Sequence, residues 1–437
     1  METKSKTSQH SVVYLVDGLR TPFLKARGIP GAFSAADLAV EAGKALLARQ
    51  NFSVDKIDQV ILGCVSPSEE EANIARIVAL RLGCPTKTPA WTVQRNCASG
   101  LQSIDSAAQS IAKGQSDLVL AGGVEAMSRI PLTLNRAMVT WLGEMSGAKT
   151  LTQKLRFATH FRPHYLVPVV ALLKGLTDPV VNLNMGQTAE ELAFQYRITR
   201  KEMDEFAVSS HRKATKALEQ GLLREVTPLY SRDGVVTEID DGIRKDSSLE
   251  KLSKLKPVFD KFGNITAGNS SQVTDGAALV LLASEQAVAK YRLPILAKIV
   301  DINWAALDPV YMGLAPVHAM TPLMQKHHLN FNDIDHFEIN EAFAAQVLAC
   351  LKLWQDENYC QKNLGLKGAF GTLPLDKLNP EGGAIAMGHP VGASGARLVL
   401  HSALMLKAKN QKRALCSLCI GGGQGGAVIL SRVTGDQ

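Results

Sequence analysis

Hydrophobic positions along the first 124 residues follow two alternating periods. Short continuous apolar runs, typical of buried strands, lie at 12–16, 59–62 and 118–121. Between these runs, apolar residues recur with helical spacing at 35–48, 73–82 and 101–111. Strands that alternate with helices in this way predict an α/β fold with a largely parallel sheet.

The regular alternation stops near residue 125; small and apolar residues return at 257–287, which we expect to rejoin the first sheet, and the alternation resumes from Pro294. The segment at 125–252 is irregular and richer in Lys and Arg, with helices predicted at 188–197 and 200–220. We interpret it as an insertion that covers one end of the first domain. In the last part of the chain, strands are predicted at 295–302, 337–339, 415–420 and 427–430, and helices at 318–328 and from 342. The last two strands form a predicted hairpin.

The two halves of the chain contain a weak internal repeat. A small-residue turn, Ala-Ser-Gly at 98–100, precedes a helix and a strand that ends in glycine at 118–123. The same order recurs from Ala-Ser-Gly at 393–395 to the glycine-ended strand at 415–423. We therefore predict a duplicated α/β domain with a site between its copies. The predicted parts are a first half at 1–124 plus 253–290, an insertion at 125–252 and a second half at 291–437.

Composition limits the class of protein. The chain has 437 residues, is 46% hydrophobic and 20% charged, and carries a formal net charge of +7, which fits a soluble globular protein of two or three domains. No long run of Lys or Arg carries the charge, and we predict no nucleic-acid partner. Anionic small ligands, acidic lipids and an acidic protein partner stay open.

Cysteine usage and the N-terminus bear on the compartment. Seven cysteines are an odd number, and no secretory signal precedes them, so we predict a reducing compartment and no disulfide framework. The first residues contain neither an apolar core nor an Arg-rich stretch. No apolar run reaches the roughly 18–20 residues that span a bilayer. The predicted location is the cytoplasm, with peripheral membrane contact left open.

Cys97 is the first candidate for chemistry. It lies between an extended apolar segment at 90–93 and the helical run that begins at Leu101, so it is predicted at a strand-to-helix turn. Free N–H groups at a helix N-terminus favour a thiolate. The small residues at 98–100 leave room for a substrate to reach the sulfur. A buried structural cysteine is the alternative, and this segment alone does not decide between them.

Asn340 and His389 are the next candidates. Asn340 follows a short apolar strand and begins a helix, where it either caps the helix or fixes a water or a carbonyl oxygen. His389 lies in a crowded turn between glycines, just before Pro390, which suits the first turn of a helix. A packed core histidine is the alternative for His389.

Two cysteines, Cys416 and Cys419, lie on a buried strand that leads into a glycine-rich loop. Their spacing suggests zinc or a redox pair, but no second such pair and no clustered histidines complete four ligands. On a strand, the two side chains point to opposite faces. We therefore predict no metal site and no tightly bound cofactor.

Taken together, Cys97, Asn340, His389 and Cys419 resemble the residues of the thiolase family. The resemblance extends over nearly the whole chain. Its motifs are Asn-Cys-Ala-Ser-Gly at 96–100, Gly-Gly-Val-Glu-Ala-Met-Ser at 122–128, Thr-Ala-Gly-Asn at 266–269, Asp-Gly-Ala-Ala at 275–278, Asn-Glu-Ala-Phe at 340–343, Gly-His-Pro at 388–390 and Cys-Ile-Gly-Gly-Gly at 419–423. The resemblance implies the five-layered thiolase fold, with two α/β halves and an inserted loop domain.

The resemblance also implies a mechanism. Cys97 attacks the 3-keto carbon of a 3-oxoacyl-CoA with His389 as base, and Cys419 protonates the departing acetyl-CoA carbanion. His389 and a water held by Asn340 form one oxyanion hole; backbone N–H groups of Cys97 and of Gly421 and Gly422 form the other. The implied reaction is degradative thiolysis in fatty-acid β-oxidation. A ketoacyl synthase would have a second histidine in place of Cys419.

The implied ligand contacts and partners follow from the same resemblance. Arg244 aligns with a phosphate contact of CoA, Ser247 with the nucleotide end and Ser271 with the pantetheine arm; exposed loop residues are the alternative. The Asn-Met-Gly segment at 184–186 lacks the histidine of short-chain thiolases, and the insertion carries a long basic and apolar stretch at 129–174. Both features are similar to the β-subunit of trifunctional complexes, which takes longer chains.

We predict that the stretch 129–174 docks on a membrane or on a hydratase–dehydrogenase subunit, in a heterotetramer built around a thiolase homodimer. Packing on its own core and lining an acyl tunnel is the alternative. The competing functions are a biosynthetic acetyl-CoA acetyltransferase and a non-catalytic lipid-binding or scaffold protein on the same fold.

Overall fold

The computed structural model describes residues 12–433 and is built on one ten-stranded sheet. Its strands, in spatial order, are β12 (His336–Ile339), β13 (Arg413–Ile420), β14 (Gln424–Ser431), β11 (Ala297–Ala306), β1 (Val13–Arg20), β10 (Thr274–Ser284), β5 (Leu118–Ala126), β3 (Gln59–Gly63) and β4 (Ala90–Val93), with β2 (Leu24–Lys25) beside β10. The halves of this sheet meet where β1 pairs with β11.

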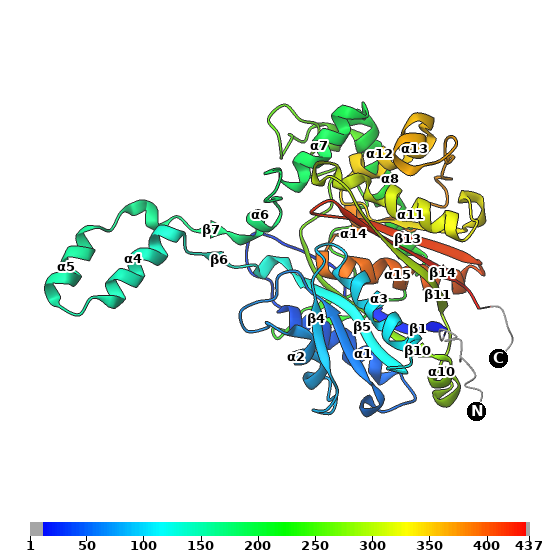
Figure 1. The fold of residues 1–437 in the computed structure, drawn as a ribbon, viewed down its shortest axis with the longest axis horizontal. Helices are drawn as coiled ribbons and strands as arrows, with labels where there is room; N and C mark the ends of the chain where they lie inside the picture. The colour runs from blue at the N-terminus through cyan, green and yellow to red at the C-terminus, as the bar shows by residue number, and fades with distance from the viewer. Residues whose placement is uncertain (1–11, 434–437) are drawn as a thin grey trace, which may run out of the picture.

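Helices divide the molecule into five layers. The middle layer consists of α3 (Ser99–Ala112) and α15 (Val391–Ala408), which lie between the two halves of the sheet (Figure 1). One outer layer consists of α1 (Ala35–Ala48) and α2 (Ile74–Arg81). The other contains α11 (Ala315–Lys326) and α12 (Ala344–Gln355), with α13 (Glu357–Leu364) beside them. The layers agree with the predicted thiolase fold.

Burial on both faces explains why the strands read as continuous apolar runs. On β10, Leu279 and Leu281 pack in the outer core with α1, whereas Val280 and Leu282 pack in the middle layer. The prediction of a largely parallel sheet is wrong, because β3 with β4, β3 with β5 and β12 with β13 are parallel but the other ladders of this sheet are antiparallel. Antiparallel strands covered by helices on both faces lose the alternation that identifies them.

The insertion joins both halves of the molecule rather than covering the first alone. Helices α7 (Met185–Gln195) and α8 (Arg200–Glu219) pack in the outer core of the second half, against α12. The remaining short elements around it are β8 (Leu229–Tyr230), β9 (Val236–Thr237), α9 (Leu249–Ser253), α10 (Glu285–Tyr291) and α14 (Ala384–Met387).

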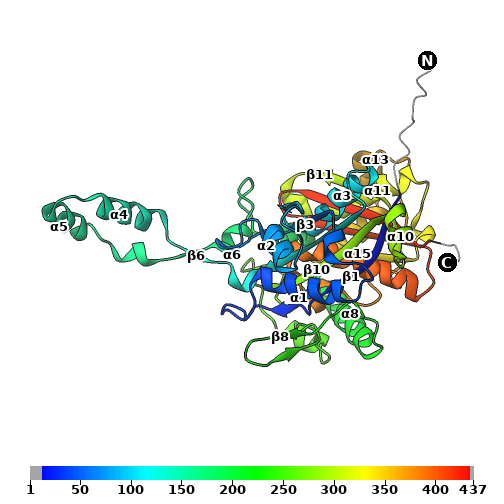
Figure 2. The same ribbon diagram turned by 90° about the horizontal axis from the view of Figure 1, so that it is seen from below.

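A long hairpin leaves the body between β5 and α7 (Figures 1 and 2). It starts with a two-stranded neck of β6 (Leu132–Thr133) and β7 (Val169–Val170), bears α4 (Arg136–Gly147) and α5 (Leu151–Thr159), and returns through α6 (Ala171–Gly175). In the described part of the chain, none of the helices combines the length and hydropathy of a transmembrane span.

Buried ion pairs fasten the insertion to both halves. Arg20 on β1 donates to both carboxylate oxygens of Asp240, at 2.6 and 2.8 Å, and to Glu225 at 3.3 Å. His401 on α15 contacts Glu225 at 3.1 Å and Glu381 at 3.4 Å. Burial alone would lower the pKa of His401, but the two carboxylates raise it to about 9, so this imidazole is protonated at neutral pH.

Among the described residues, His336, Glu338, Glu381 and His401 form a group that could hold a metal ion. Protonated His401 already supplies positive charge there, as does Arg397, which donates to Glu338 at 2.6 Å. We therefore describe the group as a buried ion-pair network.

Candidate functional site

Cys97 occupies a tight turn between β4 and α3, as the sequence predicts. Asn96, just before it, has a left-handed φ of +43°, a strained conformation for a non-glycine residue. The Ser99 hydroxyl stabilises the turn, accepting from the Arg95 N–H at 2.9 Å and donating to the Asn96 carbonyl at 2.7 Å. The turn therefore has its own polar support, independent of any ligand.

The small residues after Cys97 serve helix packing. Ala98, Ser99 and Gly100 are buried, and a Cβ on Gly100 would lie 2.8 Å from the Gly392 carbonyl oxygen of α15. The close approach of α3 and α15 thus requires glycine there. The prediction that these residues leave room for substrate is wrong. The repeated Ala-Ser-Gly stretches do not form turns either: Ser99–Gly100 and 393–395 lie within the two helices that meet.

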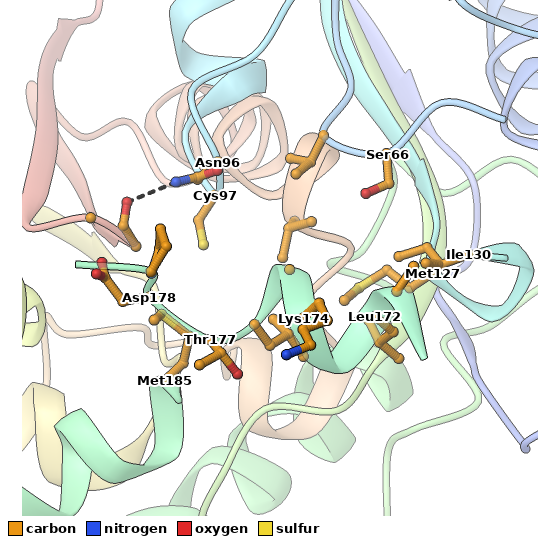
Figure 3. Close-up of a pocket in the computed structure, with 18 of the residues that line it drawn as sticks. Ser66, Asn96, Cys97, Met127, Ile130, Leu172, Lys174, Thr177, Asp178 and Met185 are labelled. Carbon is orange, nitrogen blue, oxygen red and sulfur yellow. Dashed lines mark hydrogen bonds between the residues drawn. The ribbon is translucent and has the colours of Figure 1, made fainter. Parts of the chain in front are cut away.

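The space for a substrate lies in front of the sulfur, in a cavity of about 510 Å³ (Figure 3). Its lining comes from the loop of Cys97, from the base of the hairpin around α6, from α7 and from the loop after β13. The apolar lining side chains are Val65, Met127, Ile130, Ala171, Leu172, Leu176, Pro179, Val180, Met185 and Val391. The catalytic candidate therefore faces a mostly apolar pocket that suits a hydrocarbon chain.

The glycine loop between β13 and β14 forms the wall beside Cys97. Gly421 and Gly422 line the cavity, and Asn96 donates from its side-chain nitrogen to the Gly421 carbonyl at 2.8 Å. The backbone N–H of Gly421 bonds to the Cys97 sulfur. Gly422 and Gly423 have φ of +88° and +73°, which favours glycine in this turn. The predicted oxyanion donors Cys97, Gly421 and Gly422 thus lie in adjoining loops.

His389 is held in one tautomer. Its Nδ1 lies 2.6 Å from the Ser394 hydroxyl, which itself donates to the Pro390 carbonyl at 3.0 Å. Because the Ser394 hydroxyl donates its proton to Pro390, it can only accept from His389, so Nδ1 must be the protonated nitrogen that donates to Ser394. Nε2 is then the unprotonated nitrogen and accepts from the Asn340 side-chain N–H at 3.4 Å. Burial lowers the pKa of His389 to about 4, so a neutral imidazole, able to accept a proton, is present at pH 7.

Cys97 rests as a thiol. Burial raises its pKa, and the hydrogen bond from the Gly421 N–H opposes this only in part. The expectation that the helix N-terminus favours a thiolate therefore fails, since desolvation of the charged sulfur outweighs it. A thiol at this position needs a base before it can attack a carbonyl carbon.

Cys419 is fully buried on β13, and burial together with the nearby sulfurs of Cys97 and Cys350 raises its pKa well above that of a free thiol. A thiol held neutral in this way can donate a proton to a strong base such as a carbanion. Cys416 lies in the middle layer, on the opposite face of the strand, whereas Cys419 lies in the outer core. All seven cysteines are free in this structure.

The predicted CoA contacts are only partly brought together. Arg244 and Ser247 line a surface hollow of about 210 Å³. Sequence reasoning missed two basic side chains that share it, Arg212 and Lys216; Lys245, next to Arg244, lines it as well. The i, i+4 spacing of the first two on α8 was a readable signal for one basic helix face. Ser271 lines neither this hollow nor the cavity in front of Cys97, and its N–H donates to the Ala342 carbonyl at 2.9 Å.

Glu125 is a second residue with a role that sequence reasoning did not assign. Its buried carboxylate accepts from the N–H groups of Val65, Ser66 and Gly392 at 2.9, 2.8 and 3.0 Å. It thereby ties one wall of the cavity to the start of α15. Burial raises the pKa of Glu125 to about 7 despite these donors.

Family comparisons agree with this geometry. The model of the thiolase N-terminal domain matches residues 13–286, and that of the thiolase C-terminal domain matches residues 293–432. The chain belongs to the thiolase family. As a thiolase, it is an acyltransferase that uses CoA as a substrate, and the resemblance seen in the motifs is confirmed.

Individual relatives cover almost the whole thiolase chain. Trifunctional enzyme subunit beta, mitochondrial, of Bos taurus is 39% identical over 433 residues, which is 98% of this chain and 90% of the relative. Beta-ketoadipyl-CoA thiolase of Acinetobacter baylyi is 40% identical over 428 residues, 96% of this chain and 99% of the relative. The crystal structure of human mitochondrial 3-ketoacyl-CoA thiolase in complex with CoA has a TM-score of 0.82 and 36% identity, covering 98% of this chain and 99% of that one.

Proposed function

We propose that this thiolase is a degradative 3-ketoacyl-CoA thiolase of fatty-acid β-oxidation, which cleaves a 3-oxoacyl-CoA with CoA to acetyl-CoA and a shortened acyl-CoA. The observation that carries the proposal is a Cys97 thiol that faces an apolar cavity of about 510 Å³, in a molecule that also holds His389 as a neutral imidazole. The similarity to a trifunctional enzyme subunit beta supports the same pathway.

In the first half of the proposed reaction, Nε2 of His389 takes the proton of Cys97, and the sulfur forms a bond to the 3-keto carbon. Two oxyanion holes stabilise the negatively charged oxygens that form. One consists of the backbone N–H groups of Cys97 and of the Gly421–Gly422 loop, and the other of protonated His389 and a water held by Asn340. The bond between carbons 2 and 3 then breaks, and the carbanion takes the proton of Cys419. Acetyl-CoA leaves, and the shortened acyl group stays on Cys97.

In the second half, the Cys419 thiolate takes the proton of an incoming CoA thiol. The CoA sulfur attacks the acyl carbon and Cys97 leaves as a thiolate, which regains its proton from His389. Each group ends in the state in which it began. The basic hollow around Arg244 and Ser247 supports the anchoring of the CoA phosphates there, with Ser271 proposed for the pantetheine arm.

We expect the enzyme to prefer acyl chains longer than acetoacetyl. Met185 lines the cavity with Leu172 and Leu176. It follows Asn184, which occupies the position where short-chain thiolases have a histidine. Since burial of each methylene contributes up to about 0.8 kcal/mol, kcat/KM for a 3-oxo substrate of eight or more carbons should exceed that for acetoacetyl-CoA at least about tenfold. Thiolysis assays over a series of chain lengths measure this directly.

The rival functions give different results in the same assay. A biosynthetic acetyl-CoA acetyltransferase would cleave acetoacetyl-CoA best and lose activity with length. A non-catalytic lipid-binding or scaffold protein would cleave none of the substrates. Either outcome would overturn the proposed function.

The hairpin supports a docking role. Trp141 donates to the Phe157 carbonyl at 2.8 Å and stacks edge-on against Phe161, so the hairpin has a small aromatic core of its own. Neither α4 nor α5 contains a buried residue. Large apolar side chains that stay exposed are Leu132, Leu134, Val139, Leu142, Leu151, Leu155, Leu166, Val167, Val170 and Leu173. Residues 129–174 carry seven basic side chains against one acid, Glu144.

We propose that this hairpin docks the enzyme on an anionic membrane surface or on a hydratase–dehydrogenase subunit. The alternative role for this stretch, lining an acyl tunnel, fits only the base of the hairpin, which lines the cavity. It does not explain why the helices of the hairpin project away from the body. The open edge of β4, where Trp91 is 38% exposed, supports pairing of two thiolase subunits. In this arrangement the homodimer is the core of a heterotetramer.

Shortening the hairpin tests the docking proposal. A variant in which a short linker replaces 135–167 keeps the paired neck, and we expect wild type but not this variant to co-sediment with anionic vesicles or retain the partner subunit in a pull-down. Each basic residue near an anionic surface contributes about 1 kcal/mol, so Lys154→Glu with Arg156→Glu should weaken vesicle binding without shortening the chain. Equal binding by wild type and the shortened form, or no binding by wild type, would contradict docking.

A further inference from the structure

The guanidinium group of Arg397 joins three segments of the second half. Arg397 lies on α15 and is only 4% exposed. It donates to the Glu338 carboxylate on β12 at 2.6 Å, to the Gly382 carbonyl at 3.4 Å and to the Met387 sulfur of α14 at 3.1 Å. Burial alone would raise the pKa of Glu338, but the charge of Arg397 holds it below its ordinary value. One charged side chain thus holds a strand, a loop and a short helix together.

These contacts lie close in sequence to the proposed active site. Glu338 is two residues before Asn340, and Met387 is two residues before His389. About one turn before Arg397, the same helix carries the serine that fixes the tautomer of His389. The Asn340 side-chain nitrogen and Nε2 of His389 are 3.4 Å apart. This distance depends on how the end of β12 and the turn after α14 are held, and Arg397 bridges both.

Stability alone does not account for this buried pair. Apolar residues of similar volume are often as stabilising as a buried ion pair or more so, because two charges lose their hydration when they are buried. Among residues 12–433, Nε of Arg397 has no hydrogen-bond partner, which costs free energy as well. A guanidinium group donates from a rigid plane, and apolar packing cannot reproduce those directions. The defined geometry of the contacts is therefore what the pair contributes.

We propose that Arg397 is a positioning residue for thiolysis, which sets the separation between Asn340 and His389 and so the geometry of the oxyanion hole that they form. The inference rests on the proposed thiolysis and adds to it a residue that acts through two others. Arg397 lines neither the acyl cavity nor the basic hollow around Arg244. Its replacement should therefore lower kcat and change KM little.

The experiment measures kcat and KM with a 3-oxoacyl-CoA of about eight carbons, the length class that burial of methylenes should favour. Arg397→Met combined with Glu338→Gln removes both charges, so neither is left buried without a partner. This variant should lower kcat about 100-fold, the effect of a displacement of about 1 Å at a reacting group, with KM within about threefold of wild type. Arg397→Lys keeps a charge beside Glu338 but not the planar fork, and should lose less.

Arg20→Lys is the matched control. Arg20 is fully buried and pairs with Asp240 and Glu225, where it joins β1 to the insertion. Among residues 12–433, none of its side-chain hydrogen bonds reaches the strand before Asn340 or the turn of His389. This control should lower the melting temperature measured by circular dichroism and keep kcat.

A second comparison separates positioning from a general loss of structure. Asn340→Ala removes one of the two groups whose separation Arg397 sets, so adding Arg397→Lys to it should lower kcat by less than about twofold further. Additive losses in the two backgrounds, or an unchanged kcat in Arg397→Met with Glu338→Gln, would overturn the inference. Failure of wild type to cleave a 3-oxoacyl-CoA would instead contradict the proposed function, so the two failures are distinguishable.

Discussion

Replacing Cys97 with serine is expected to lower kcat for thiolysis by about 1,000-fold or more, the scale on which enzymes lose activity with their nucleophile. A hydroxyl is a much weaker acid than a thiol, so proton transfer from serine to His389 is far less favourable than proton transfer from Cys97. Circular dichroism of the variant should match wild type, because the two side chains have similar volume. The rate is measured by loss of a 3-oxoacyl-CoA in the presence of CoA.

Labelling gives the control for this prediction. Cys97 is partly exposed, whereas the other six cysteines are buried, so iodoacetamide should modify Cys97 first, and bound acyl-CoA should slow the reaction. Cys84→Ser, which changes a buried cysteine of the outer core, should keep thiolysis. If Cys64 or Cys350 reacted first and activity fell in parallel, Cys97 would not be the nucleophile.

Periodicity predicted the elements well because it reports burial. The helix predicted at 35–48 is α1 (Ala35–Ala48), and the predicted hairpin at 415–430 is β13 with β14. The sequence pattern could not predict which strands are parallel and which are antiparallel. On β10 every residue is buried, so no polar face distinguishes an antiparallel strand from a parallel one.

The site residues were predicted from local motifs, but their supports were not. Ser394 fixes the tautomer of His389 and lies only five residues away. The sequence nevertheless does not indicate which group the hydroxyl of a helical serine contacts. Glu125 meets Gly392 across 267 positions of the chain. The contact of Glu125 with Gly392 depends on the packing of β5 against α15. For the same reason, the raised pKa of Cys97 follows from burial that the helix start at Ser99 does not reveal.

The hairpin at 129–174 shows how composition and structure complement each other. The excess of basic residues and the apolar side chains between 129 and 174 indicated an interface. The structure adds the division between a base that lines the cavity and helices that project away from the body. A partner bound to those helices would therefore lie at the end of the paired neck that leads to the substrate cavity.

Replacing Cys419 with alanine is expected to separate the two halves of the reaction. Cleavage of the carbon–carbon bond requires a proton for the departing carbanion, and the buried neutral Cys419 thiol supplies it in the proposed mechanism. Thiolysis of 3-oxoacyl-CoA should therefore fall about 1,000-fold. Transfer of an acyl group from a saturated acyl-CoA to Cys97 uses Cys97 and His389, and should persist slowly. Intact-protein mass spectrometry detects that acyl group as an added mass.

A matched control lies on the same strand. Cys416 is three residues earlier, on the opposite face, and its thiol contacts the Ser402 hydroxyl at 3.1 Å between α15 and β13. Cys416→Ala removes the same atom from a site that faces away from Cys97, so it should keep both acyl transfer and thiolysis even if the protein unfolds at lower temperature. Full thiolysis in Cys419→Ala would assign the acid to another residue. Loss of acyl transfer as well, with the fold intact, would mean that Cys419 acts on Cys97 itself rather than on the leaving carbanion.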